Sequence, residues 1–154
     1  MENKKQRMAS NGDMLKIYNF KEEIIMAVIS KGIKLSYKNG GGSSYTDLTN
    51  LQEIPELGGN SEAIEITTLE DAAHMYTDGI LNYGDSLAFT FLYEKTQFDT
   101  LQDLTGSVSW QVTLPDNTTC TFTGTSSVKL AGVGVNAALT YTLNVKPDSA
   151  MTWA

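Results

Sequence analysis

The glycine-rich stretch GVGVNA at 132–137 has the clearest spacing for cofactor chemistry in the chain. It matches G-x-G-x-x-A, the glycine pattern of dinucleotide-binding turns. That mechanism needs a helix to begin directly after the glycines, so that the helix N-terminus faces the pyrophosphate. Here the glycines open an alternating stretch that is typical of a β-strand. We therefore interpret the motif as a turn and expect no bound cofactor.

Glu70, Asp71 and His74 would lie together if residues 69–75 were helical. His74 is the single histidine of the chain, however, and a typical metal site uses several imidazole or thiolate ligands. The sequence therefore favours a solvated loop or a capping role over a metal site.

Catalysis has little support in the sequence. No local signature marks a Ser, Cys or Thr nucleophile, and His74 is the one available imidazole base. The GGG run at 40–42 lacks the lysine of a phosphate-binding loop, and the NTT sequon at 117–119 is interpreted as a turn. A carboxylate pair for glycoside hydrolysis depends on the fold and stays open. We predict that the protein is not an enzyme.

Five stretches alternate between apolar and polar residues and predict β-strands: 33–38, 63–67, 86–93, 108–114 and 135–146. In the last one, side chains from Val135 to Val145 are expected to share one face. PDN at 115–117 favours a turn, so residues 107–124 are predicted to form a hairpin. Cys120, the single cysteine, shares a strand face with Phe122 and is predicted to be a buried, inert thiol.

One short helix is predicted between Thr96 and Thr105. Thr96 and Asp99 resemble a capping box, and Gly106 fits the C-terminal cap. Three apolar side chains share one helical face, which should pack on a sheet because so short a helix is marginal alone. These residues are Phe98, Leu101 and Leu104.

The segment 39–61 is too long for an ordinary hairpin loop, yet it carries several apolar side chains. We take five of them as candidates for a subunit-interface loop, and the alternative is that they cover the core of their own subunit. They are Tyr45, Leu48, Leu51, Ile54 and Leu57.

Charge and hydropathy exclude two classes of partner. The chain has 18 acidic and 11 basic residues, and residues 26–154 contain six lysines, fourteen acids and no arginine. This balance lacks the basic footprint of a nucleic-acid-binding protein. No apolar run approaches the roughly 20 residues that a membrane-spanning helix needs, so no membrane partner is expected.

The first 25 residues differ from the rest, because the β-rich pattern begins only after Met26. KEEIIM at 21–26 can be encoded as AAG GAG GAA ATT ATT ATG, which contains a bacterial ribosome-binding sequence before an ATG codon. We therefore predict that residues 1–25 are a translated leader and that residues 26–154 form the domain. The alternative is a flexible N-terminal arm.

The order of several motifs carries a family resemblance over this domain. They are ISKGIKLSY at 29–37, LQEIPELG at 51–58, IEITT at 64–68, YTDGI at 76–80, GDSLAFTF at 84–91 and LPDN at 114–117. In this order they resemble the tail tube (major tail) proteins of siphophages that infect Gram-positive hosts. The family usually has PDG where this chain has PDN, a mild departure because Asn also tolerates positive φ.

The resemblance implies a mainly β fold, an antiparallel β-sandwich or partial barrel with one short flanking α-helix and a long loop. It implies a structural subunit that forms hexameric rings stacked into a tail tube, with phage DNA passing through the lumen without specific binding. Expected partners are further copies of the chain, the tape-measure protein, and the tail initiator and terminator proteins. The expected location is the virion tail, and the host cytoplasm during assembly.

Two alternatives stay open at this point. One is the tube protein of a phage-derived bacteriocin or injection device, which would share the fold. The other is a β-sandwich carbohydrate or cell-wall binding module, which would expose aromatic side chains to stack on sugars. Tyr45, Tyr83 and Trp153 are the aromatic residues that could do so.

Overall fold

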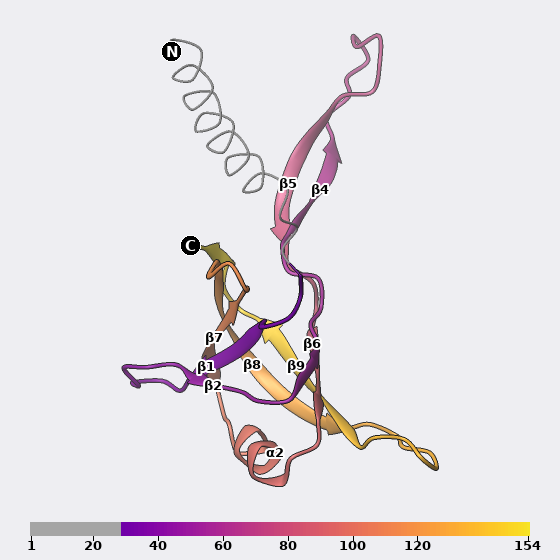
Figure 1. The fold of residues 1–154 in the computed structure, drawn as a ribbon. Coiled ribbons are helices and arrows are strands. Elements are labelled where there is room, and N and C mark those ends of the chain that lie inside the picture. Colours follow the sequence, from indigo (N-terminus) through magenta and orange to yellow (C-terminus); the bar gives the residue numbers. More distant parts are fainter. Residues whose placement is uncertain (1–28) are drawn as a thin grey trace, which may run out of the picture. The chain divides into compact units, whose positions relative to one another are not determined.

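The computed structural model describes residues 29–154 (Figure 1). The predicted leader or arm, residues 1–25, lies outside the described residues, and its boundary at Met26 stays a prediction. No helix within the described part is long and apolar enough to cross a membrane. The elements are β1 (Lys34–Lys38), β2 (Thr46–Asp47), β3 (Leu51–Glu53), β4 (Asn60–Glu65), β5 (Tyr76–Asn82), β6 (Leu87–Leu92), α2 (Lys95–Gln102), β7 (Ser107–Thr113), β8 (Thr119–Leu130), β9 (Thr140–Pro147) and β10 (Thr152–Trp153).

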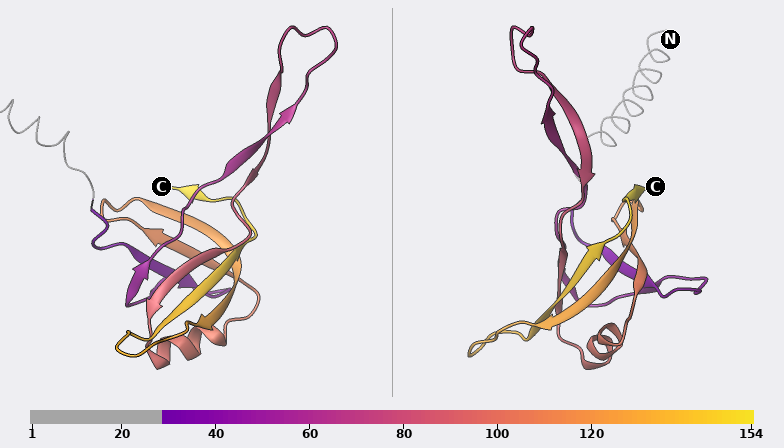
Figure 2. Two further views of the ribbon diagram at one scale, coloured as in Figure 1. Left: turned by 90° about the vertical axis from the view of Figure 1, so that its right-hand side faces the viewer. Right: turned by 180° about the vertical axis from the view of Figure 1, so that it is seen from behind.

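Eight strands form one antiparallel sheet in the order β2-β1-β7-β8-β9-β6-β3, with β10 paired to β8. The edge strands β2 and β3 are separated in sequence only by residues 48–50. A linker of this length spans at most about 14 Å, so the sheet must curl until its two edges approach each other. Figure 2 shows this curled sheet from two sides. The predicted mainly β fold, with antiparallel pairing and a partial barrel, is confirmed.

The core fills the inside of the curl with the apolar side of each alternating strand. Its largest fully buried side chains are Trp110, Tyr141, Phe89 and Phe91. The indole Nε1 of Trp110 donates a hydrogen bond to the Gly124 carbonyl at 3.2 Å, so the buried ring leaves no polar atom unpaired.

The predicted buried thiol is confirmed, because Cys120 lies in this core. Burial raises the pKa of the Cys120 thiol, since a thiolate would be poorly solvated there. The predicted 107–124 hairpin is also confirmed: β7 pairs with β8, and Asn117 takes the positive φ of 68° that its turn requires.

Helix α2 begins one residue earlier than predicted, and its cap is different. The N-cap is Glu94, whose carboxylate accepts hydrogen bonds from the amides of Thr96 and Gln97. Asp99, the predicted capping-box partner of Thr96, instead binds Lys95 at 2.7 Å. Glu94 takes over the capping role because its extended backbone directs the carboxylate back over the first turn.

The packing face of α2 is as predicted. Leu101 is buried, and Phe98 and Leu104 pack against the core. Gln97 ties the helix to the curl: its amide nitrogen donates to the Tyr141 hydroxyl at 2.6 Å, and its amide oxygen accepts from the Thr49 amide at 2.9 Å.

The predicted strand 135–146 is wrong in its first five residues. β9 begins at Thr140, and residues 135–139 form an exposed turn between β8 and β9. Asn136 adopts a left-handed φ of 60°, which interrupts a strand, and Val135 is 96% exposed. The alternation of apolar and polar residues predicted a strand here, because the pattern is the same whether or not the apolar side chains are buried against the core.

Candidate assembly surfaces

The β4–β5 hairpin, residues 60–82, is a two-stranded sheet of its own. It pairs with none of the other described strands and extends away from the curled sheet (Figures 1 and 2). Every residue of β4 and β5 is exposed except the half-buried Gly79. A two-stranded hairpin is marginally stable by itself in water, so contact with another molecule would stabilise this element.

One face of the hairpin is apolar. Strand register places Ile64 opposite Thr77, and the Ile66 amide donates to the Met75 carbonyl at 2.9 Å. Ile64, Ile66 and Met75 therefore share a face, and each is between 50% and 52% exposed. At the tip Leu69 is fully exposed. The described residues 29–154 leave this stripe uncovered, and an exposed apolar stripe of this kind often marks an interaction surface.

The opposite face is polar. Glu65 Oε1 and His74 Nδ1 are 2.5 Å apart, and the His74 ring stacks on Tyr76 with centroids 6.3 Å apart. Hydrogen bonds from His74 and then Thr67 hold the pKa of Glu65 below its usual value. Glu65 ends β4 and His74 lies two residues before β5, so their contact joins the two sides of the hairpin.

Glu70, Asp71 and His74 would lie together only on a helix, and residues 69–75 instead form an exposed loop, as the sequence favoured. Asp71 has a capping role: its carboxylate accepts from the Thr68 amide at 2.7 Å and the Thr68 hydroxyl at 2.9 Å. Within residues 29–154, no three His, Cys, Asp or Glu side chains lie together as metal ligands would.

The second protruding surface is the β8–β9 arm, residues 126–142, where these strands run past the core into the exposed turn. Its exposed apolar side chains are Leu130, Val133, Val135 and Leu139. Leu87 pairs with Val145 near the end of β9, beside the base of the hairpin, and Leu92 pairs with Thr140 at its beginning. The hairpin and the exposed turn of the arm, residues 131–139, thus lie at opposite ends of β9, which spans about 26 Å.

A third surface is the outward side of β6, β7, β8 and β9. These four strands contain no Asp or Glu, and their outward positions are mostly threonine and serine. Register aligns them in rows, such as Gln111 with Thr121 and Thr90 with Thr142. We call this surface the hydroxyl face. Lys129 and Lys146 lie toward its two ends, opposite Thr142 and Thr125.

The predicted interface loop, residues 39–61, passes the seam where the two sheet edges approach, and we call it the seam loop. Leu48 is 7% exposed and its amide donates to the Leu35 carbonyl at 2.8 Å. Leu51, Ile54 and Leu57 are partly buried against the core. Tyr45 is half-buried, with the Lys38 ammonium 5.1 Å from its ring centroid. The loop therefore covers its own core, and any contact with a neighbouring subunit stays a prediction.

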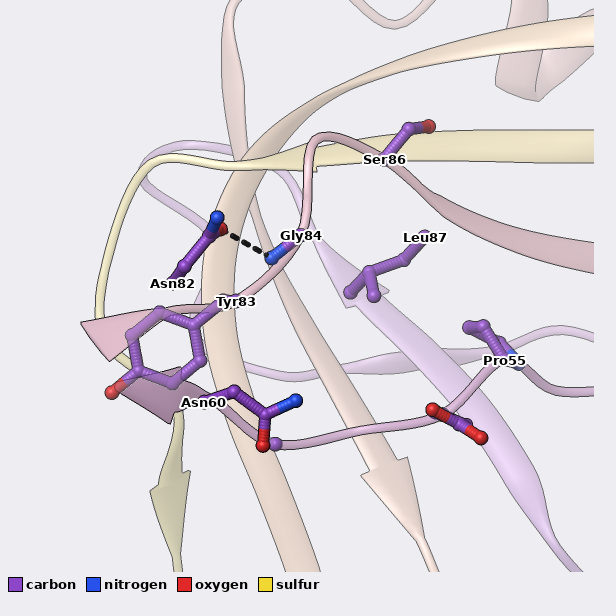
Figure 3. Close-up of a pocket in the computed structure, with 9 residues that line it drawn as sticks. Pro55, Asn60, Asn82, Tyr83, Gly84, Ser86 and Leu87 are labelled. Atoms are coloured by element: carbon purple, nitrogen blue, oxygen red, sulfur yellow. Dashed lines mark hydrogen bonds between the residues drawn. The ribbon is translucent and has the colours of Figure 1, made fainter. Parts of the chain in front are cut away.

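A pocket of about 470 Å³ lies at the base of the hairpin (Figure 3). Asn82 Oδ1 accepts a hydrogen bond from the Gly84 amide at 2.9 Å, which shapes the turn that joins β5 to β6. The ring of Tyr83 forms one wall, and Pro55, Asn60 and Leu87 also line the pocket. With one carboxylate in its lining, from Glu56, the pocket offers no pair of groups for acid–base catalysis.

A family model described as "Phage tail tube protein, TTP" matches residues 36–154. The chain belongs to this family of phage tail tube proteins. The match covers both edges of the curled sheet, the hairpin and the β8–β9 arm. No curated protein matches the sequence.

Two solved structures share the fold of this tail tube protein. One is a chain in a cryo-EM structure of the anti-feeding prophage (AFP) baseplate, 6-fold symmetrised, with a TM-score of 0.66, 16% identity, and coverage of 84% of this chain and 96% of that one. The other is a chain in the tail of an empty GTA particle computed with helical refinement and C6 symmetry. It has the same TM-score and identity, and covers 83% of this chain and 99% of that one.

Two surfaces of this tail tube protein were not predicted as sites from sequence. The hairpin was detectable, since residues 60–82 combine apolar alternation with five acids and no Lys or Arg. The β8–β9 arm was not recognisable from the sequence, because Val135 and Leu139 continue the apolar–polar alternation of β9. The signal against a strand was Gly132, Gly134 and Asn136, residue types that tolerate positive φ.

Proposed function

We propose that the protein is a purely structural subunit whose copies form rings, and that the rings stack into a tail tube around a DNA-conducting lumen. The observation that carries this proposal is the pair of uncovered apolar surfaces at opposite ends of β9, the β4–β5 hairpin and the β8–β9 arm. A subunit with two different interaction surfaces, one at each end, forms heterologous contacts with its neighbours. Such head-to-tail contacts propagate into filaments, whereas contacts between identical surfaces close into dimers.

Six subunits per ring is the number that we propose. The two solved structures compared above were symmetrised or refined with six-fold symmetry. One of them is the baseplate of an anti-feeding prophage, so the proposal extends to tubes of phage-derived devices. Membership of the tail tube family places the protein in a virion tail, and assembly would occur in the host cytoplasm.

The hydroxyl face is the surface that we propose for the lumen. Its four strands carry hydroxyl and amide groups without a carboxylate, and their two lysines lie toward the ends. Such a surface offers DNA few phosphate contacts, and each contact avoided removes salt-sensitive affinity. The excess of acids elsewhere in residues 26–154 adds a repelling field. DNA would therefore pass without specific binding.

Contacts within a ring are the proposed role of the seam loop. Leu48 is buried in the core. The surface that remains for contact with a neighbouring subunit therefore consists of Tyr45 and the exposed parts of Leu51, Ile54 and Leu57. The remaining proposed partners are the tape-measure protein inside the tube and the initiator and terminator proteins at its two ends. Membership of the tail tube family and the two unlike ends of the subunit support this part of the proposal.

Sedimentation velocity over a range of concentrations tests the proposal. Hexamers or longer polymers should appear as concentration rises, because each added contact covers apolar side chains that are exposed in the subunit. The measurement is repeated on residues 26–154 alone, so that the first 25 residues cannot mask assembly. A monomer at every concentration in both forms would contradict the proposal.

A further inference from the structure

The two protruding surfaces are complementary in charge as well as in polarity. The β4–β5 hairpin, residues 60–82, contains five acids and neither Lys nor Arg. The β8–β9 arm, residues 126–142, contains one charged residue, Lys129, and no acid. Lys129 is exposed and takes part in none of the ion pairs found among residues 29–154.

Each surface also has an apolar part for the other to cover. The hairpin presents Leu69 at its tip and the stripe around Ile64 and Ile66. The arm presents Val133, which is 53% exposed, and Val135. Charge complementarity around apolar contacts selects a partner and fixes its register.

The β4–β5 hairpin extends away from the curled sheet at the end of β9 that is farther from the exposed turn of the arm, so the two surfaces of one subunit do not meet (Figures 1 and 2). A second copy brings them together if it lies head to tail with the first. We infer that the β4–β5 hairpin of a subunit in one ring docks on the β8–β9 arm of a subunit in the next ring, with the hairpin acids around Lys129. This pairing rests on the proposed tube function and names the two surfaces that hold successive rings together.

Zero-length carbodiimide cross-linking of full-length wild-type polymers tests the pairing without a mutation. The reagent couples a lysine amine directly to a carboxylate, so a peptide that joins Lys129 to residues 60–82 must come from two copies. The pairing predicts this peptide in polymers and its loss in dilute, unassembled protein. Links from the hairpin acids to Lys4, Lys5, Lys16 or Lys21 instead would show that the N-terminal segment covers the hairpin, and would overturn the pairing.

Charge reversal gives an independent test. Lys129→Glu and Glu70→Lys should each raise the concentration needed for polymer growth about tenfold, because like charges then face each other. The chain that carries both changes should polymerise nearly as well as wild type. Lys146→Glu is the matched control, since it makes the same charge change at the other end of the β8–β9 strand pair and should have little effect.

The outcomes separate the pairing from the function. Polymers that form equally well in all four variants, or a double variant that loses the sum of both effects, would overturn the pairing and leave the tube function standing. Wild-type protein that never polymerises would contradict the tube function itself. Thermal unfolding of each variant shows whether a loss of polymer reflects a misfolded subunit.

Discussion

At the residue scale, the tightest constraint in the core concerns Gly124 on β8. A Cβ at this position would collide with the carbonyl of Lys146 on the neighbouring strand, and the Gly124 carbonyl already accepts the indole hydrogen bond of Trp110. Glycine therefore lets β8 approach the end of β9 closely while Trp110 fills the space inside the curl. Sequence alone shows a glycine inside a strand but does not show which backbone it approaches.

We predict that Gly124→Ala lowers the free energy of unfolding by about 1–3 kcal/mol, because the backbone of Lys146 must move to admit the methyl group. Chemical denaturation of the unassembled subunit measures the change. Gly132→Ala is the matched control: a Cβ there meets no atom within 4 Å, and the stability should change by less than about 0.5 kcal/mol. Equal stability of Gly124→Ala and wild type would contradict this reading of the close approach.

At the element scale, the seam loop joins the two edges of the sheet and separates two kinds of apolar residue. Leu48 fills the gap between the edges from inside, whereas Tyr45 lies half-buried at the surface beside Lys38. The sequence identified both as apolar residues in a long loop and left open whether they face the core or a neighbour. The choice depends on how far the sheet curls, and that is a property of all its strands together.

Leu48→Ala should therefore affect the stability of the subunit, and Tyr45→Ala should affect its assembly. Leu48→Ala is expected to lower the free energy of unfolding by about 2–4 kcal/mol, because it opens a cavity under the seam. Tyr45→Ala should leave unfolding nearly unchanged and raise the concentration needed for ring formation. Thermal unfolding and sedimentation of both variants provide the comparison. Normal rings from a fully folded Tyr45→Ala protein would remove the seam loop from the proposed interface.

The elements differ in how well the sequence predicts them. Alternation located β1, β6 and β7, because one side of each strand is buried and the other is solvated. It also predicted a strand over 135–139, where both sides are exposed, since a period of two records side-chain direction and not coverage. The sequence shows the acids of the hairpin and the lysine of the arm. Only the strand register of the structure shows where these charged residues lie relative to β9.

At the scale of the whole molecule, the subunit has unlike ends and a neutral side. The hairpin lies at one end of β9, the arm at the other, and the hydroxyl face lies between them. This arrangement suits a unit that repeats along an axis while it keeps one side free of binding groups. It also gives the acidic balance of the chain a physical role, since five of the acids are on the hairpin.

Lysines placed on the hydroxyl face should slow DNA passage. We predict that a virion whose tail subunits carry Gln111→Lys, Thr121→Lys and Thr142→Lys keeps intact tubes yet ejects DNA more slowly at low salt, because each phosphate contact adds about −0.9 to the log–log salt slope of binding. Gln111→Asn, Thr121→Asn and Thr142→Asn form the neutral control. Normal ejection of DNA from the lysine tubes at low salt would mean that another face lines the lumen.

The central claim is that copies of this one chain build a tube. Electron microscopy of the full-length protein, purified and concentrated without other phage proteins, tests it most directly. The account predicts tubes or short stacks of six-fold rings with an open channel, in which successive rings meet through the β4–β5 hairpin. A field of single subunits or closed two-fold dimers at every concentration would contradict it.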